Sequence, residues 1–194
     1  MRVFYANVDV FNETKRIELY NYIFTENIQI VALVEVFPKC SFDLEIYKKL
    51  LIIEGFETVW PENLNILNRG IVFLVKKGIF FEIEKFSCFN ESLALRFNFS
   101  GKLYRIGLIY RSPSNPDFDG LTAFTREFFS LGGPSMLVGD FNMPKVDWRS
   151  LTGLQNDSEQ FLKIIRNLYI DQIVDKCTRF RIGNAPSKLD LYFI

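Results

Sequence analysis

The amino-acid sequence predicts an α/β sandwich, in which helices cover β-sheets. Segments with helical and strand patterns alternate along the whole chain, and the almost continuously apolar run at 28–36 is typical of a strand buried on both faces. Residues 92–99 and 103–110, separated by a Ser-Gly turn, predict a β-hairpin. With 194 residues, 48% of them hydrophobic, the chain can bury one substantial core, so we expect a single domain spanning 1–194.

The predicted strands are short apolar runs. In the hairpin, Leu93, Leu95, Phe97 and Phe99 occupy alternate positions and share one face. The segment 68–81 predicts a strand with a Lys-Lys-Gly turn. Further strands are expected at 2–5, 28–36, 136–140 and 187–194.

Four segments have helical spacing. In the first, Ile17, Tyr20 and Phe24 share one helical face, and the clearest helix has its apolar residues at i, i+3, i+4 and i+7. The helices are expected at 12–27, capped by Asn12 or Thr14, at 43–54, at 120–131, and at 157–168, capped by Asp157 or Ser158.

The composition excludes several classes of protein. Lys plus Arg and Asp plus Glu both number 23, so the strong overall basic charge of many nucleic-acid-binding domains is absent. Three cysteines far apart argue against a disulfide framework and a structural zinc site. There is no apolar run of about 18 residues and no signal peptide, so we expect an intracellular protein, nuclear or cytoplasmic, that does not bind a membrane.

The chain contains no histidine. Its chemistry therefore cannot use imidazole as a base, an acid or a metal ligand. This excludes Ser-His-Asp and Cys-His hydrolase mechanisms and most zinc catalysis.

Polar residues follow apolar runs at four places. They are Asn7, Glu35, Asp140 with Asn142, and Asp190. In mixed α/β folds the ligand site usually lies at the ends of the central strands. Carboxylates gathered there without Cys or His form a set of oxygen donors suited to Mg²⁺ or Mn²⁺.

Each of these residues also has a purely structural interpretation. Asn7 can form a turn at a strand end, and Asp140 with Asn142 can form an Asx-turn into Pro144. Asp190 can pair with an arginine. Glu35 is more informative, because a carboxylate in a buried strand is costly unless a positive group meets it. The functional interpretation rests on the residues taken together.

Seven ordered segments resemble the endonuclease/exonuclease/phosphatase superfamily, and within it the apurinic-endonuclease-like domain of non-LTR retrotransposons. The most specific is VGDFNMPKVDW, which is similar to the family's GDFN-x-P-x-x-D-W pattern. The others are YANVDVFNETK with Asn7 and Lys15, VALVEVF with Glu35, NRGIVFLVKKGI, LIYRSPS with Tyr110 and Arg111, the stretch from Leu168 to Arg179, and SKLDLYF with Asp190.

The resemblance implies a four-layer α/β sandwich of two mixed β-sheets flanked by helices, and Mg²⁺- or Mn²⁺-dependent phosphodiester hydrolysis. The resemblance implies that Glu35 binds the metal ion with Asn7 beside it, and that Asp140 activates the attacking water. It implies phosphate contacts for Asn142 and Tyr110, and places Asp190 in the same pocket. It also implies contacts with the DNA backbone for Arg111 and Lys15. Solvated surface roles are equally open for Arg111 and Lys15.

The chain also departs from the family pattern. That pattern continues beyond the S-x-L-D strand to a closing Ser-Asp-His strand, whereas this chain stops at Ile194. We therefore expect the last catalytic strand to be missing and the domain to be incomplete at its C-terminus.

Two functions follow as hypotheses. The first is a monomeric Mg²⁺-dependent endonuclease domain of a retrotransposon-type protein associated with reverse transcription. This domain would nick double-stranded DNA, leave a 3′-hydroxyl and use no small-molecule cofactor. The second is a non-catalytic remnant that at most binds metal or nucleic acid. A third hypothesis, hydrolysis of a phosphoinositide or another phosphoester, is less favoured, because the YRSP and DFNMPKVDW segments resemble the retrotransposon branch.

Overall fold

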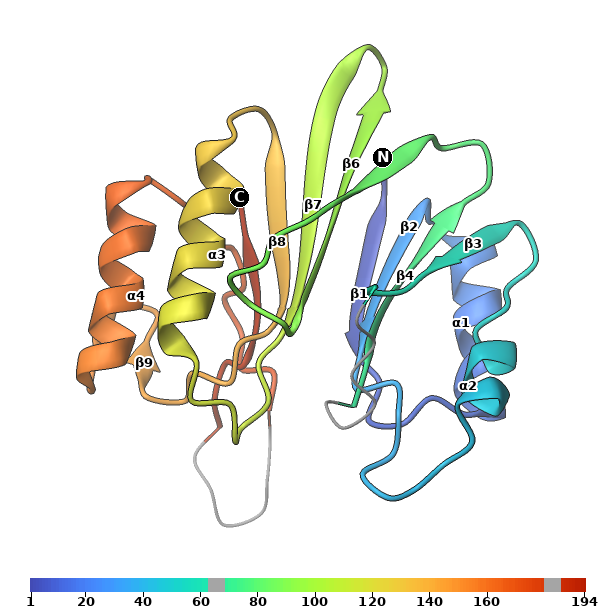
Figure 1. Cartoon of the computed structure of the whole chain (residues 1–194), viewed down its shortest axis with the longest axis horizontal. Helices are drawn as coiled ribbons and strands as arrows, with labels where there is room; N and C mark the ends of the chain where they lie inside the picture. Colours follow the sequence, from blue (N-terminus) through green and yellow to red (C-terminus); the bar gives the residue numbers. More distant parts are fainter. Residues whose placement is uncertain (63–68, 180–185) are drawn as a thin grey trace.

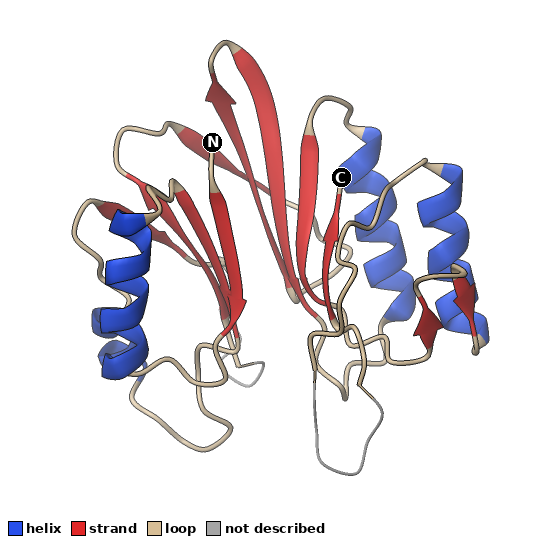
Figure 2. Ribbon diagram, turned by 180° about the vertical axis from the view of Figure 1, so that it is seen from behind, coloured by secondary structure: helices blue, strands red, loops and turns tan. Residues whose placement is uncertain are grey.

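Two β-sheets pack face to face in the computed structural model, and helices cover the outer face of each (Figures 1 and 2). The structure describes residues 1–62, 69–179 and 186–194. The predicted four-layer α/β sandwich is therefore confirmed. Among these residues, no helix is long and apolar enough to cross a membrane.

The first sheet has the strand order β1-β2-β4-β3, with β1 parallel to β2 and the other pairs antiparallel. All five residues of β2 are buried, as the apolar run predicted. Helices α1 and α2 cover its outer face (Figure 1). The elements are β1 (Val3–Asn7), α1 (Glu13–Thr25), β2 (Ile30–Val34), α2 (Leu44–Leu50), β3 (Phe56–Val59) and β4 (Ile71–Lys76).

The second sheet has the order β11-β8-β7-β6-β5, with β7 parallel to β8 and the other pairs antiparallel. Helices α3 and α4 cover its outer face (Figure 1). The elements are β5 (Phe81–Glu84), β6 (Ser92–Phe99), β7 (Lys102–Tyr110), α3 (Phe118–Ser130), β8 (Ser135–Asp140), the short strands β9 (Val146–Asp147) and β10 (Thr152–Gly153), α4 (Asn156–Asn167) and β11 (Asp190–Phe193).

The predicted hairpin joins β6 to β7. Ser100 and Gly101 both have positive φ, 51° and 76°, as a tight two-residue hairpin turn requires. Leu93, Leu95 and Phe97 are buried in the layer between the two sheets. The pleat and the turn together fix which face of this hairpin enters the core.

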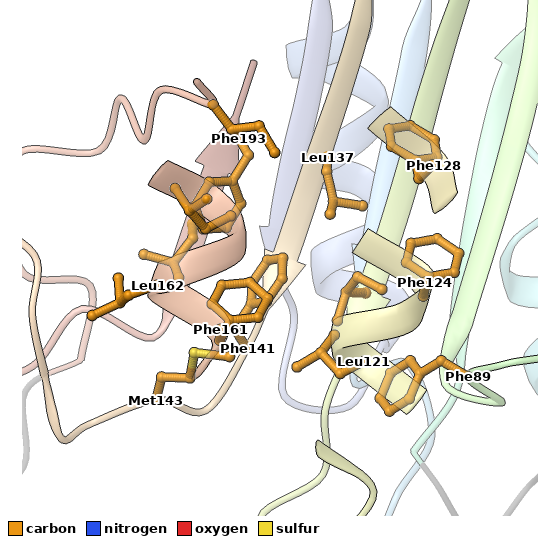
Figure 3. Packing of buried hydrophobic residues seen from close by; sticks show 14 of the residues in the cluster. Phe89, Leu121, Phe124, Phe128, Leu137, Phe141, Met143, Phe161, Leu162 and Phe193 are labelled. Atoms are coloured by element: carbon orange, nitrogen blue, oxygen red, sulfur yellow. The ribbon is translucent and has the colours of Figure 1, made fainter. Parts of the chain in front are cut away.

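A second core layer lies between the second sheet and its helices (Figure 3). Aromatic rings dominate it: Phe141, Phe161 and Phe193 contact one another with centroid separations of 5.1 to 6.0 Å. Phe193 lies on β11 and Phe141 directly follows β8, so this packing holds the ends of the two strands together. A third apolar cluster lies between the first sheet and α1 and α2.

Several local predictions were wrong. In α1 the buried residues are Leu19 and Ile23, whereas Ile17, Tyr20 and Phe24 are exposed. The helix is apolar on two faces, so spacing alone could not choose between them. The cap position of α4 is Gln155, without a side-chain cap bond, rather than Asp157 or Ser158. Asn12 does cap α1, accepting from the amide of Lys15.

Strand prediction also missed several elements. The 68–81 segment contains β4 and its turn, but Phe81 already begins β5, which belongs to the other sheet (Figure 1). Residue 68 lies outside the described residues. The short strands β3, β9 and β10 were not predicted. The expected absence of a closing strand remains a prediction.

Candidate functional site

The strand ends converge at one edge of the sandwich, the lower edge in Figure 1. Asn7 is the last residue of β1, Glu35 directly follows β2, and Asp140 is the last residue of β8. In the second sheet Asp140 pairs with Asp190 on one side and with Tyr110 on the other. The register thus aligns three polar groups across β11, β8 and β7.

These residues line one pocket of about 690 Å³. Six of the eight predicted site residues line it, namely Asn7, Glu35, Tyr110, Asp140, Asn142 and Asp190. Arg111 and Lys15 are not among its lining residues. The pocket therefore joins residues from both sheets.

The Asn7 side chain links the two sheets. Its Nδ2 donates to Glu35 Oε1 at 3.0 Å and to Asp140 Oδ2 at 3.1 Å. Asn7 Oδ1 accepts from the backbone N–H of Asp9 at 3.2 Å, which holds the amide in this orientation. One amide thus aligns two carboxylates that are 105 residues apart in the sequence.

The loop after β8 fits both interpretations of Asp140 and Asn142, the Asx-turn and the functional site. Asp140 Oδ1 accepts from the backbone N–H of Asn142 at 3.0 Å, so the Asx-turn exists. The same Asp140 contacts Asn7 through its other oxygen. Asn142 has a positive φ of 47°, and its Nδ2 donates to the carbonyl of Arg111 at 2.6 Å. The turn therefore positions these side chains at the pocket.

The carboxyl groups of Asp140 and Asp190 carry raised pKa values. Burial raises the pKa of Asp140 to about 6, and the nearby charge of Asp190 adds to the shift. Burial also raises the pKa of Asp190, whose Oδ1 accepts a 2.5 Å hydrogen bond from the Tyr5 hydroxyl. The pKa of Tyr110 rises to about 12, chiefly through burial and then through Asp140. Tyr110 is therefore a protonated hydrogen-bond donor at neutral pH.

Arg69 was not predicted as a site residue. Its Nη1 forms an ion pair with Glu35 Oε2, its Nη2 lies 2.6 Å from Asp9 Oδ1, and its Nε donates to the carbonyl of Phe37. The hydrogen bond from Arg69 holds the pKa of Asp9 below its usual value. The sequence feature that could have indicated Arg69 is the NRG triplet, in which an arginine precedes a glycine just before an apolar run.

Other pocket residues were also not predicted as site residues. Thr178 Oγ1 accepts from the backbone N–H groups of Leu189 and Asp190, both at 3.1 Å, and so positions the start of β11. Lys39 and Arg179 line the pocket and add positive charge beside the carboxylates. Arg179 ends the Leu168 to Arg179 stretch, so the sequence resemblance contained this signal.

Lys15 lies beneath the loop after β1. Its Nζ donates to the carbonyl of Val8, and to those of Asp9 and Val10 at 2.9 and 3.0 Å. Asp9 and Val10 both have positive φ, 38° and 68°, which is unusual for a β-branched residue such as Val10. Three hydrogen bonds use all three ammonium protons, so this geometry favours loop positioning over the predicted DNA contact.

Arg111 also makes local contacts. Its two terminal nitrogens donate to the carbonyls of Asn142 and Asn115, at 3.1 and 3.0 Å, and its guanidinium lies 4.4 Å from the centre of the Phe118 ring. Arg111 thereby fixes the loop after β7 against the loop after β8. Its predicted DNA contact remains a prediction.

Replacing Lys15 by methionine is expected to destabilise the fold by about 1–2 kcal/mol, because three carbonyl groups lose their donor. Urea unfolding measures this loss. If Lys15 positions the loop, the salt dependence of DNA binding stays as in the wild type. A clear decrease of the salt slope in Lys15→Met would instead support direct contact with a phosphate.

Comparisons with known proteins agree with this architecture. Residues 104–194 match the family model described as endonuclease-reverse transcriptase. The endonuclease domain of TRAS1, a telomere-specific non-LTR retrotransposon, aligns with a TM-score of 0.70 and 15% identity, over 99% of this chain and 83% of that domain. The AP endonuclease of Leishmania major also gives a TM-score of 0.70, at 12% identity, over 98% of this chain and 78% of its own.

A 3′ phosphatase from Neisseria, solved with a product DNA hairpin, aligns with a TM-score of 0.61 and 16% identity over 100% of this chain and 86% of its own. No curated protein sequence matches the chain significantly. The chain thus has the fold of the endonuclease/exonuclease/phosphatase superfamily. Within this fold it is similar to the endonuclease domain of a non-LTR retrotransposon, and its C-terminal part has the sequence pattern of the endonuclease-reverse transcriptase family.

Proposed function

We propose that this chain is a divalent-metal-dependent DNA endonuclease domain that hydrolyses one phosphodiester bond of double-stranded DNA and leaves a 3′-hydroxyl. The observation that supports this function best is the hydrogen-bonded cluster of Glu35, Asn7 and Asp140, which joins the ends of three strands in one pocket. Phosphodiester hydrolysis needs positioning, charge neutralisation and an activated water, and this cluster offers suitable groups for each.

The donors in the pocket fit Mg²⁺ or Mn²⁺. Carboxylate oxygens are hard ligands, and Glu35 would hold the ion, with Asn7 beside it as the donor that orients this carboxylate. Among the described residues, no group of three or more His, Cys, Asp or Glu side chains is arranged to hold a metal ion alone. Mg²⁺ commonly uses one or two carboxylates together with waters and substrate phosphates, so Glu35 could serve as the carboxylate ligand from the protein. When bound, the ion would neutralise charge on the phosphate.

The remaining roles follow from the hydrogen bonds. Asp140, with a pKa of about 6, is largely ionised at neutral pH and orients or deprotonates the attacking water. Tyr110 donates its hydroxyl proton in a hydrogen bond to the phosphate. Asn142 has a second amide hydrogen besides the one given to Arg111, and this hydrogen contacts a phosphate oxygen. Asp190, hydrogen-bonded to Tyr5, stays in the pocket as a further carboxylate beside Asp140.

DNA is the proposed substrate because structural neighbours act on it. One neighbour is the endonuclease domain of a retrotransposon, and the Neisseria phosphatase was solved with product DNA. We infer that the domain acts as a monomer, in a retrotransposon-type protein whose nick primes reverse transcription. The match of residues 104–194 to the endonuclease-reverse transcriptase family supports this context.

Replacing Glu35 by glutamine is expected to lower plasmid nicking in Mg²⁺ by about 10²-fold or more, because the amide cannot neutralise or hold the cation as the carboxylate does. Conversion of supercoiled to open-circular plasmid measures nicking, and extension of the nick by a DNA polymerase tests for the 3′-hydroxyl. Glu57→Gln is the matched control, since Glu57 is exposed on β3 in the same sheet.

Two outcomes would contradict this assignment. Unchanged nicking in Glu35→Gln would remove Glu35 from the metal site. A folded wild-type chain that does not nick in Mg²⁺ or Mn²⁺ would support the non-catalytic remnant instead.

A further inference from the structure

Arg69 is the only buried cation among the described residues that line the pocket. Its side chain is 10% exposed, whereas Lys39 is exposed and Arg179 is half-buried. Removing a guanidinium from water is costly unless partners compensate it. Glu35, Asp9 and the Phe37 carbonyl supply these partners.

The backbone around Arg69 is held in a strained conformation. Arg69 has φ 53° and Gly70 has φ 70°, so two successive residues occupy the left-handed region. A Cβ atom on Gly70 would lie 2.5 Å from the Phe37 ring, which makes glycine necessary there. Such strain costs about 1–3 kcal/mol for a non-glycine residue and persists only where the surroundings enforce it. Here it keeps the guanidinium beside the carboxylates instead of in solvent.

The guanidinium has hydrogen-bonding capacity left over. It carries five N–H donors, and three of them have acceptors among the residues that the structure describes. The other two belong to the terminal nitrogens of Arg69, and Arg69 and Glu35 both line the pocket. A phosphate presents the planar pair of oxygens that this fork recognises.

We propose that Arg69 is a catalytic residue whose guanidinium contacts a non-bridging oxygen of the phosphodiester and stabilises the charge that develops there during hydrolysis. This inference rests on the proposed endonuclease function. The chain has no histidine, so a cationic hydrogen-bond donor at the phosphate must be an arginine or a lysine. Arg69 is the arginine whose position is fixed by the same Glu35 that would hold the metal ion.

Steady-state nicking at saturating Mg²⁺ tests this role with Arg69→Lys and Arg69→Met. Loss of a donor that contacts the phosphate in the complex and binds the transition state more tightly lowers kcat by about 10²–10³-fold and raises KM by a smaller factor. Arg69→Lys keeps the charge that Glu35 needs for folding but lacks the planar fork, so we expect it to fold and still to lose kcat. Circular dichroism and urea unfolding report the folded fraction of each variant. Arg96→Met, which removes a surface arginine paired with Glu82, is the control.

Binding of a short DNA duplex in EDTA gives a readout that does not depend on turnover. One lost phosphate contact should reduce the slope of log Kd against log salt by about 0.9 in Arg69→Met, with no reduction in Arg96→Met. A purely structural ion pair would leave this slope unchanged.

The outcomes separate the two proposals. A nicking wild-type chain whose folded Arg69→Lys and Arg69→Met variants keep kcat within about twofold overturns the role of Arg69 alone. The role of Arg69 is also overturned if Arg69→Met reaches the wild-type kcat at a lower Mg²⁺ concentration than the wild type needs. Arg69 would then only compete with Mg²⁺ for Glu35. If the wild type binds DNA without nicking it, the endonuclease function fails, and an unchanged salt slope in Arg69→Met overturns the phosphate contact as well. A wild type that neither nicks nor binds DNA overturns both.

Discussion

Replacing Gly139 by alanine is expected to destabilise the protein by at least about 3 kcal/mol, near the upper end for single substitutions. Gly139 lies in β8 directly before Asp140 and has φ 152°, a conformation that residues with a side chain rarely adopt. A Cβ atom at this position would lie 2.0 Å from the carbonyl oxygen of Ile109 in β7. The obstacle is a backbone atom within the central β7–β8 ladder, so no side-chain rotation can relieve it.

The control for this substitution is Gly101→Ala. Gly101 also has positive φ, 76°, but no atom lies within 4 Å of its added Cβ, so only backbone strain of about 1–2 kcal/mol remains. Urea unfolding followed by circular dichroism compares the two variants. Equal losses would show that the close approach of β7 and β8 does not govern stability at Gly139.

The same substitution should also impair the site. Strand pairing aligns Asp140 with Tyr110 and Asp190 across the three strands. Any shift that separates β8 from β7 at Gly139 therefore moves Asp140 relative to both neighbours. Nicking per folded molecule should fall in Gly139→Ala and stay unchanged in Gly101→Ala.

The polar residues at the strand ends could be predicted because their placement follows from local pattern and general geometry. Each of Asn7, Glu35 and Asp140 ends an apolar run, and such runs become strands of a sandwich, of which β2 and β8 are central and β1 lies at the edge of its sheet. The carboxyl ends of the parallel strands in each sheet then lie at one edge. The sequence therefore predicted which side chains meet, without any knowledge of the distances between them.

The contacts of Arg69 could not be predicted in this way. Arg69 meets Glu35 across 34 residues and Asp9 across 60, through loops that lie outside any repeating pattern. Arg69 and Gly70 both have positive φ, and the Phe37 ring leaves no room for a Cβ atom on Gly70, a constraint that local propensity does not reveal. The geometry of these loops thus decides which positively charged side chain lies in the pocket.

The short charged strands were missed for a related reason. The β5 sequence, FEIE, carries two glutamates in four residues, and it forms a strand by pairing with β6. The exposed stripe of α1 shows the converse problem. Ile17, Tyr20 and Phe24 have the spacing of a buried face, yet Leu19 and Ile23 are the residues of α1 that are buried. Tertiary contacts chose between two apolar faces that the pattern could not distinguish.

Replacing Asp140 by asparagine is expected to abolish most nicking while stabilising the metal-free protein at neutral pH. As a water-activating group, Asp140 should contribute about 10²–10⁴-fold to the rate. Its effect on stability has the opposite sign, because its pKa rises from 3.8 when unfolded to about 6 when folded. The folded state then binds the proton more tightly than the unfolded state, so this group favours folding at low pH.

As the pH rises from about 4 to above 6, this advantage is lost, and the ionised carboxylate costs about 3 kcal/mol of folding free energy at neutral pH. Asn at this position carries no charge, and its carbonyl oxygen can still accept from the backbone N–H of Asn142, but its NH₂ group then faces the Nδ2 donor of Asn7, which offsets part of the gain. We therefore expect Asp140→Asn to raise the free energy of unfolding in EDTA at about pH 8 by up to this amount. At about pH 4 the difference should nearly vanish, because the wild-type carboxyl is then protonated in the folded state.

Asp147→Asn provides a control with the opposite sign. Hydrogen bonds from Ser150 and Arg149 lower the pKa of the exposed Asp147, so its ionised form favours folding at neutral pH. Its replacement should therefore slightly destabilise the protein at about pH 8 and leave nicking unchanged. Urea unfolding in EDTA at both pH values, combined with plasmid nicking in Mg²⁺, measures the two variants. If the stability difference between Asp140→Asn and the wild type does not change between about pH 4 and about pH 8, Asp140 is not held against a desolvation cost. The pocket would then lack the stored electrostatic free energy that a bound cation could release.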